Sequence, residues 1–187
     1  MTQPATSRNL YVYGFDETPC SGVPLDALSQ LIDTATGLPS SRYSYGFVIP
    51  PAAIQRVHVN VCYSAGMGNE KRVTPNDFGY CDLLVIVCGA HWIPYNEWSA
   101  DMHVGPGVKR CVNFRLPFLQ DDLIVAEFID GGPVVPFGQP LPDGQIVNVD
   151  CSGLGLSHTT ILADWRIIAA IMAEVAKIGG SDAITPS

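Results

Sequence analysis

The sequence predicts an α+β fold, in which a mostly antiparallel sheet of about seven or eight strands carries one helix near each end of the chain. Three observations lead to this prediction. β-prone segments bounded by glycine, proline and asparagine fill the middle of the chain. Helical periodicity is confined to two segments near the ends. Residues 54–64 alternate apolar and polar side chains, as in an antiparallel strand packed on one side. The alternative is a β-sandwich or jelly roll with two added helices.

The first elements are expected to be a strand at 10–15 and a helix that begins at Val23. Pro24 suits the first turn of that helix, and Gly37 is a natural stop. The spacing of five residues creates one apolar face, formed by Leu25, Leu28, Leu31, Ile32 and Ala35. This face is expected to pack against the sheet.

The middle of the chain is expected to be β-structure, with strands at 42–51, 54–64 and 81–93. The run from Leu83 to Val87 shows no alternation, which predicts a central strand buried on both faces.

The strand at 54–64 has one polar face, formed by Arg56, His58 and Asn60. A polar strand face is compatible with solvent, with a cleft and with a contact to another chain. The pattern leaves these three alternatives open.

Strands at 108–118 and 123–130 are expected to lead into a hairpin over 134–150. Asp143-Gly144 is a strong turn signal between its β-prone flanks. A second helix is predicted over 160–178. Its core face is formed by Ile161, Trp165, Ile168, Met172 and Val175, and is extended by Ile167 and Ile171. The chain, 1–187, is expected to be a single domain with flexible tails at 1–8 and 181–187.

The charge pattern argues against nucleic acid and membrane as partners. Ten basic and 18 acidic residues give a formal net charge of −8, and the basic residues are scattered. Nucleic-acid binding depends on Lys and Arg contacts with phosphates, so direct binding is not expected. The longest apolar run is far shorter than the ~18–20 residues of a membrane span. With no signal-like N-terminal run, we expect a cytoplasmic or particle-assembled protein whose six cysteines are reduced and buried.

The segment Asp150–Leu154, DCSGL, contains the main candidate for chemistry. It resembles the nucleophile segment of the NlpC/P60 cysteine peptidases, which implies Cys151 as a nucleophile. In that family the cysteine opens a helix, where a thiol pKa is lowered, and the catalytic histidine lies well downstream on a strand. Here the one downstream histidine is His158, seven residues on, and an upstream histidine such as His58 is the other candidate base.

A packing interpretation competes with this chemistry. In it, Cys151 ends a strand beneath the final helix, and the glycines that follow form an elbow. Cys88, His91 and His103 have metal-like spacing, but Cys88 continues an apolar strand, and cysteine is among the most often buried residues. No metal and no cofactor are expected, and we find no nucleotide-binding fingerprint.

Composition favours a structural role over an enzymatic one. Only 15% of the residues are charged, against about 25% in an average soluble protein. The leading hypothesis is a subunit of a larger particle, of the virion or phage-component type, that contacts itself or other structural proteins. Its interface anchors would be Tyr95, Trp98 and Phe137. The alternatives are a small cysteine-dependent hydrolase, which would use Cys151 with His58 or His158, and a small-molecule-binding α+β domain.

Overall fold

The computed structural model describes residues 8–13, 23–44, 55–61, 64–65, 81–88, 90–91, 102–105, 107–116, 134–136, 142–157 and 160–179. The predicted strand at 123–130 lies outside this part of the chain, as do residues 1–7 and 181–187 of the two expected tails.

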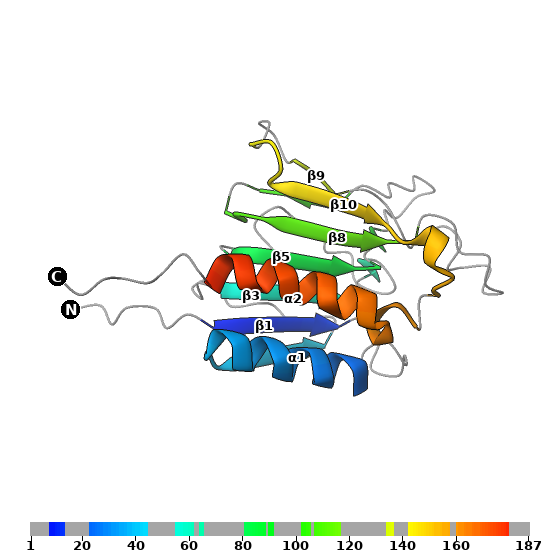
Figure 1. Cartoon of the computed structure of the whole chain (residues 1–187). Helices are drawn as coiled ribbons and strands as arrows, with labels where there is room; N and C mark the ends of the chain where they lie inside the picture. Colours follow the sequence, from blue (N-terminus) through cyan, green and yellow to red (C-terminus); the bar gives the residue numbers. More distant parts are fainter. Residues whose placement is uncertain are drawn as a thin grey trace.

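The main element is a six-stranded sheet in which every strand runs parallel to its neighbours, in the order β10-β8-β5-β3-β1-β2 (Figure 1). Its strands are β1 (Arg8–Tyr13), β2 (Ser40–Ser44), β3 (Gln55–Val61), β5 (Cys81–Val87), β8 (Cys111–Arg115) and β10 (Ile146–Asp150). Two short parallel pairs accompany it: β4 (Ser64–Ala65) with β6 (Ala90–His91), and β7 (Met102–Val104) with β9 (Val134–Pro136). The arrangement is of the α/β type, so the predicted antiparallel α+β sheet and the jelly-roll alternative are both wrong.

The lengths of the connections explain the parallel pairing. A hairpin turn joins antiparallel strands, whereas a parallel pair needs a crossover of about a dozen residues or more. The crossover from β1 to β2 contains α1 (Val23–Thr36). The next strands of the sheet are joined through residues 45–54, 62–80, 88–110 and 116–145. These four connections carry no clear helical periodicity, so the sequence pattern suggested a row of antiparallel strands instead.

The predicted hairpin over 134–150 is also wrong. Asp143 and Gly144 do form a turn, with Gly144 at φ 78° and the Gln145 N–H donating to the Pro142 carbonyl at 3.1 Å. This turn leads into β10, which pairs with β8, whereas β9 pairs with β7. The turn depends on local backbone conformation, but the choice of partner strand depends on distant residues.

Helices α1 and α2 (Trp165–Gly179) cover the same face of the sheet and contact one another (Figure 1). Helix α1 buries Leu25, Leu28 and Ile32, as its spacing predicts, while Leu31 is 47% exposed. The two helices and this face of the sheet share one hydrophobic core.

Helix α2 begins later than predicted, and of its predicted core face only Trp165 lies outside the core. Residues Ile161–Ala163 form a 3-10 turn, and the α-helix starts at Trp165. Ile167, Ile171 and Val175 are buried in the core, whereas Trp165 is 74% exposed. Apolar residues surround much of this helix, so spacing alone admits several faces, and contact with the sheet and α1 selects one.

Strands β3 and β5 lie in the middle of the sheet and are buried on both faces. In β5 every residue from Leu83 to Val87 is buried, which confirms the central-strand prediction. In β3 the polar face is also buried, since His58 is 0% and Asn60 is 2% exposed. Alternation along β3 therefore reflects two different protein environments rather than one face in water.

Candidate functional site

The strand order changes direction between β1 and β3. After β1 the chain crosses to β2 on one side, and then adds β3, β5, β8 and β10 on the other side. In open parallel sheets, ligands bind outside the carboxyl ends of the strands at such a switch point. The carboxyl end of β3, where Asn60 and Val61 lie, is therefore the candidate position for a ligand in this topology.

A row of asparagines crosses the sheet on the face opposite the helices. The register pairs Asn60 with Ile86, Ile86 with Asn113, and Asn113 with Asn148, on four adjacent strands. Their neighbours along each strand, such as Val59, belong to the core on the helix side. Asn113 Nδ2 donates to Asn148 Oδ1 at 2.9 Å. The row thus brings three neutral amides to one face of the sheet.

Within this row, Asn60 contains a buried acceptor without a described partner. The residue is 2% exposed, and its Oδ1 accepts no hydrogen bond from any described residue. An unsatisfied buried polar group costs about 1–3 kcal/mol. A group that costs stability at the position where the topology expects a ligand is a candidate binding group.

Charged residues lie two positions after the asparagines on β8 and β10, on the same face of the sheet. Arg115 ends β8 and Asp150 ends β10, with Arg115 Nη2 3.9 Å from Asp150 Oδ2. Asp150 Oδ1 accepts hydrogen bonds from the Ser152 hydroxyl at 2.6 Å and from the Ser152 N–H at 2.9 Å. These hydrogen bonds hold the pKa of Asp150 below its ordinary value, so this carboxylate is charged at neutral pH.

The sequence pattern identified the polar face of β3 but missed Asn113, Asn148 and Arg115. The signal that could have found the asparagines is a repeated triplet: Val59-Asn60-Val61, Val112-Asn113-Phe114 and Val147-Asn148-Val149. An amide between two core residues of one strand must lie on the other face of the sheet. Three such triplets form a polar row once the strands are parallel neighbours.

The structure does not bring Cys151 and His58 together. Cys151 follows β10 and is completely buried in the core shared with α2, in agreement with the packing interpretation. Its Sγ lies 3.7 Å from the Val149 carbonyl oxygen, and burial, with Asp150 nearby, raises the thiol pKa. His58 belongs to the opposite face, so the sheet separates the two side chains. His158 lies outside the described residues.

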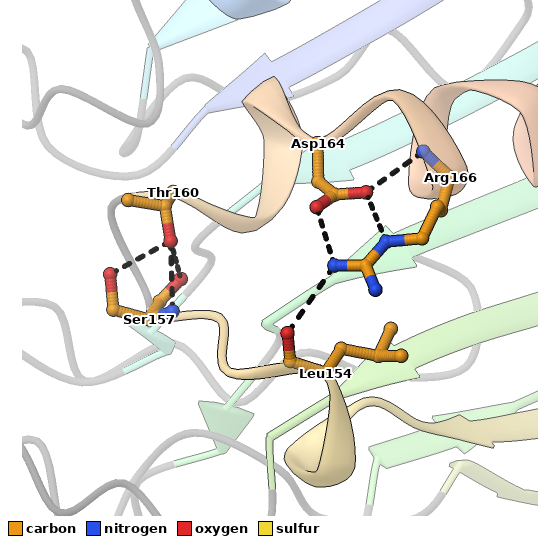
Figure 2. A network of polar contacts seen from close by, with 5 residues as sticks. All are labelled: Leu154, Ser157, Thr160, Asp164 and Arg166. Atoms are coloured by element: carbon orange, nitrogen blue, oxygen red, sulfur yellow. Dashed lines mark hydrogen bonds and ion pairs between the residues drawn. The ribbon is translucent and has the colours of Figure 1, made fainter.

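Two polar networks hold the chain between β10 and α2 (Figure 2). Asp164 accepts hydrogen bonds from the backbone N–H of Arg166 at 2.8 Å and from its Nε at 2.9 Å. The Arg166 guanidinium also donates to the Leu154 carbonyl at 3.3 Å, and it lowers the pKa of Asp164 to about 2. Nearby, the Ser157 N–H donates to Thr160 Oγ1 at 2.9 Å. These contacts fix the start of α2.

The expected interface anchors Tyr95, Trp98 and Phe137 lie outside the described residues. In the described part, the large apolar side chains exposed to solvent are Leu31, Leu154 and Trp165.

The described cysteines are all buried thiols: Cys81, Cys88, Cys111 and Cys151. Burial raises the pKa values of Cys81 and Cys111. Among the described segments, no three His, Cys, Asp or Glu side chains form a group that could hold a metal ion. No helix in these segments has the length and apolar character needed to cross a membrane.

No protein-family model, curated protein or solved structure matches this chain. A function must therefore be argued from the residues of the site, because a fold alone is compatible with many functions.

Proposed function

We propose that the chain is a small-molecule-binding α/β domain. Its ligand would lie on the face opposite α1 and α2, at the carboxyl ends of β3, β5 and β8. The observation that carries the proposal is the buried amide of Asn60, whose Oδ1 has no described partner beside the switch point of the sheet. A few placed polar groups on an otherwise apolar surface are typical of ligand sites.

The composition of the sheet supports this proposal. Parallel strands buried on both faces are usually continuous apolar runs, and β5 is such a run. An apolar side chain at position 60 would avoid the cost of burying an unsatisfied amide. Natural proteins often carry such costs at functional sites, where activity and stability oppose one another. The buried row of Asn60 and Asn113 therefore favours a functional role over a purely structural one.

Asn60→Leu tests the proposal, because leucine has a similar branched shape but no hydrogen-bonding group. Ligand-observed NMR with a library of small polar molecules should find binders of the wild type. We expect Asn60→Leu to weaken these binders about tenfold or more. The control is Asn9→Leu, on the helix side of β1. Measured well below its unfolding temperature, this variant should bind the same molecules as the wild type. Binders that are insensitive to Asn60→Leu would contradict the proposed site.

The assembly-subunit hypothesis is the second candidate function. The observation that favours it is Trp165, which is 74% exposed at the start of α2. Leu154, 37% exposed, lies close by, since its carbonyl accepts a hydrogen bond from Arg166. Exposed aromatic residues are common anchors of protein interfaces. Native mass, measured by light scattering over a range of concentrations, tests this hypothesis.

A further inference from the structure

Helix α2 is apolar nearly all round, although one of its faces points away from the sheet (Figure 1). The face toward the sheet is formed by Ile167, Ile171 and Val175, which are buried. Among residues 165–178, the exposed positions are Trp165, Arg166, Ala169, Ala173, Ala176 and Lys177. A surface helix of a soluble protein normally carries charged and polar residues on its outer face, whereas a helix that is apolar all round is usually covered. The outer face of α2 is therefore a candidate contact surface.

Four of these residues form a row along the outer face of α2. Trp165, Ala169, Ala173 and Lys177 are each four residues apart, the spacing of the surface rows that align when two helices pack. The row begins with an indole that is 74% exposed and ends with a lysine side chain that is 59% exposed. The two alanines between them allow a second helix axis to approach to about 8 Å.

This row is complementary to a reversed copy of itself. If two such rows run antiparallel about their midpoint, the Trp165 of each copy lies beside the Lys177 of the other, and each Ala169 lies beside the other Ala173. An ammonium over the face of a tryptophan ring is attracted by the negative charge of that face. The antiparallel direction also places the positive N-terminus of each helix beside the negative C-terminus of the other.

The charge of α2 also favours a second copy of the chain as the partner. The whole chain has a formal net charge of −8, so two copies repel one another over most approaches. The charged residues of α2 are Arg166, Glu174 and Lys177, which sum to +1. Each of them has an ion-pair partner on its own chain. Two copies can therefore meet through α2 without bringing unpaired acidic side chains together.

Helix α1 widens this surface, because it lies beside α2 on the same face of the sheet. Its exposed positions include Ala27, Leu31 and Ala35. Helices of 14 and 15 residues are about 21 and 22 Å long, and two of them side by side are about 20 Å wide. The flat area of this surface, roughly 450 Å², is below the ~800 Å² that each partner buries in a standard interface. We therefore expect a weak, reversible contact with a dissociation constant in the micromolar range.

We infer that a second copy of this chain covers the outer face of α2. The two α2 helices pack antiparallel in a two-fold symmetric dimer, in which each Trp165 ring contacts the partner's Lys177. The inference rests on the assembly hypothesis and adds the identity of the partner and the contact that joins it. It does not involve the proposed ligand site, which lies on the opposite face of the sheet.

The first test places opposite charges on the two alanines in separate variants, and measures native mass by light scattering up to millimolar concentration. Ala169→Glu and Ala173→Lys each put an unpaired charge into the contact, so each should weaken self-association by about tenfold or more. An equimolar mixture of the two should regain the dimer, because the new carboxylate of one chain meets the new ammonium of the other. Both new residues are good helix formers. A mixture of Ala169→Glu with Ser40→Lys, which adds the same charge on the edge strand β2, should stay monomeric.

The second test removes the cation at the end of the row. Lys177→Gln should weaken the dimer by about 5- to 30-fold, because two contacts with the Trp165 ring are lost in each dimer. Lys177→Arg keeps a cation for the ring and should keep the dimer. Lys109→Gln makes the same charge change at a side chain that is 77% exposed and lies outside α2, and should have no effect.

The outcomes separate this inference from the proposed functions. A wild-type chain that stays monomeric at millimolar concentration overturns the dimer. A larger mass that Ala169→Glu does not reduce also overturns it, but keeps the assembly hypothesis with another surface. If the two alanine variants stay monomeric when mixed, the antiparallel pairing is wrong. Ligand binding that is lost in Asn60→Leu and kept in Ala169→Glu leaves the ligand site standing in each case. Circular dichroism of each variant confirms that the fold is retained.

Discussion

Two buried asparagines on neighbouring strands have different roles at the scale of single residues. Asn9 on β1 belongs to the helix side, and its Nδ2 donates to Asp33 at 2.9 Å and to Thr36 at 2.7 Å. Asn60 on β3 belongs to the opposite face, and its Oδ1 has no described partner. Both residues are buried, 0% and 2% exposed. The Oδ1 of Asn9 also has no described partner, so the two residues differ in the hydrogen bonds that Asn9 Nδ2 donates, which neither sequence neighbourhood reveals.

The same substitution at these two asparagines should therefore have opposite effects on stability. Asn60→Leu removes an unsatisfied buried amide and should raise the free energy of unfolding by about 1–2 kcal/mol. Asn9→Leu removes two hydrogen bonds and leaves Asp33 and Thr36 without this donor. It should therefore lower the free energy of unfolding by about 2–4 kcal/mol. Urea unfolding followed by circular dichroism measures both changes. A large loss of stability in Asn60→Leu would show that the amide is satisfied in the ligand-free protein.

Polar contacts between distant residues position both helices at the scale of elements. The Tyr11 hydroxyl on β1 donates to Asp33 on α1 at 2.7 Å. Burial and this hydrogen bond raise the pKa of Tyr11, so it stays a neutral donor at physiological pH. Helix α2 is held to the start of β8 through Arg110 and Glu174, 2.5 Å apart. Apolar spacing predicts these two helices, but it does not predict contacts whose partners are far away in the sequence.

The start of α2 should make stability depend on pH through Asp164. Its pKa of about 2 in the folded protein lies below the ordinary value of 3.8, because it accepts hydrogen bonds from Arg166. The stabilisation is therefore present above about pH 4 and is lost as the pH falls toward 2. Asp164→Asn keeps a good helix-capping residue but removes the charge.

Thermal unfolding of the wild type and of Asp164→Asn at a series of pH values tests the prediction. We expect the difference in Tm between wild type and Asp164→Asn to shrink between pH 4 and pH 2. Asp143→Asn, which removes the same charge from an exposed turn, should not reproduce this change. A Tm difference that stays constant over this pH range would contradict the role assigned to Asp164.

The connections between strands decide the architecture at the scale of the whole molecule. Each connection within the six-stranded sheet is at least ten residues long, which is too long for a tight hairpin. The sheet has β2 and β10 at its edges, and both described helices lie on one face. The start of α2 leaves Trp165 exposed, and this is where the assembly hypothesis can be tested.

If the chain is an assembly subunit that uses this surface, its native mass should exceed 20.1 kDa and rise with concentration. Trp165→Asp should then shift the mass toward the monomer, while Trp165→Phe, which stays aromatic, should not. An aspartate in the first turn of a helix is favourable, so the first substitution is not expected to unfold α2. Light scattering behind a sizing column measures all three proteins. A wild-type monomer at high concentration would contradict this hypothesis.

The sequence by itself determined the local features of this protein. It identified α1, the central buried strand β5, the turn at Asp143-Gly144 and the polar face of β3, because each depends on residues close together in the chain. Part of the candidate site was therefore visible, namely Asn60. The sequence also allowed Cys151 two interpretations, a nucleophile and a buried strand-ending thiol, and could not choose between them.

Only the tertiary structure decided the direction of the strands, their order and the faces on which side chains meet. Parallel pairing aligned Asn60, Asn113 and Asn148 across four strands, although Asn60 and Asn148 are far apart in the sequence. The same pairing put Cys151 and His58 on opposite sides of the sheet. The physical reason is that strand pairing and register arise from long-range packing and backbone hydrogen bonds. Local periodicity indicates that a side chain is buried, but not which residues bury it.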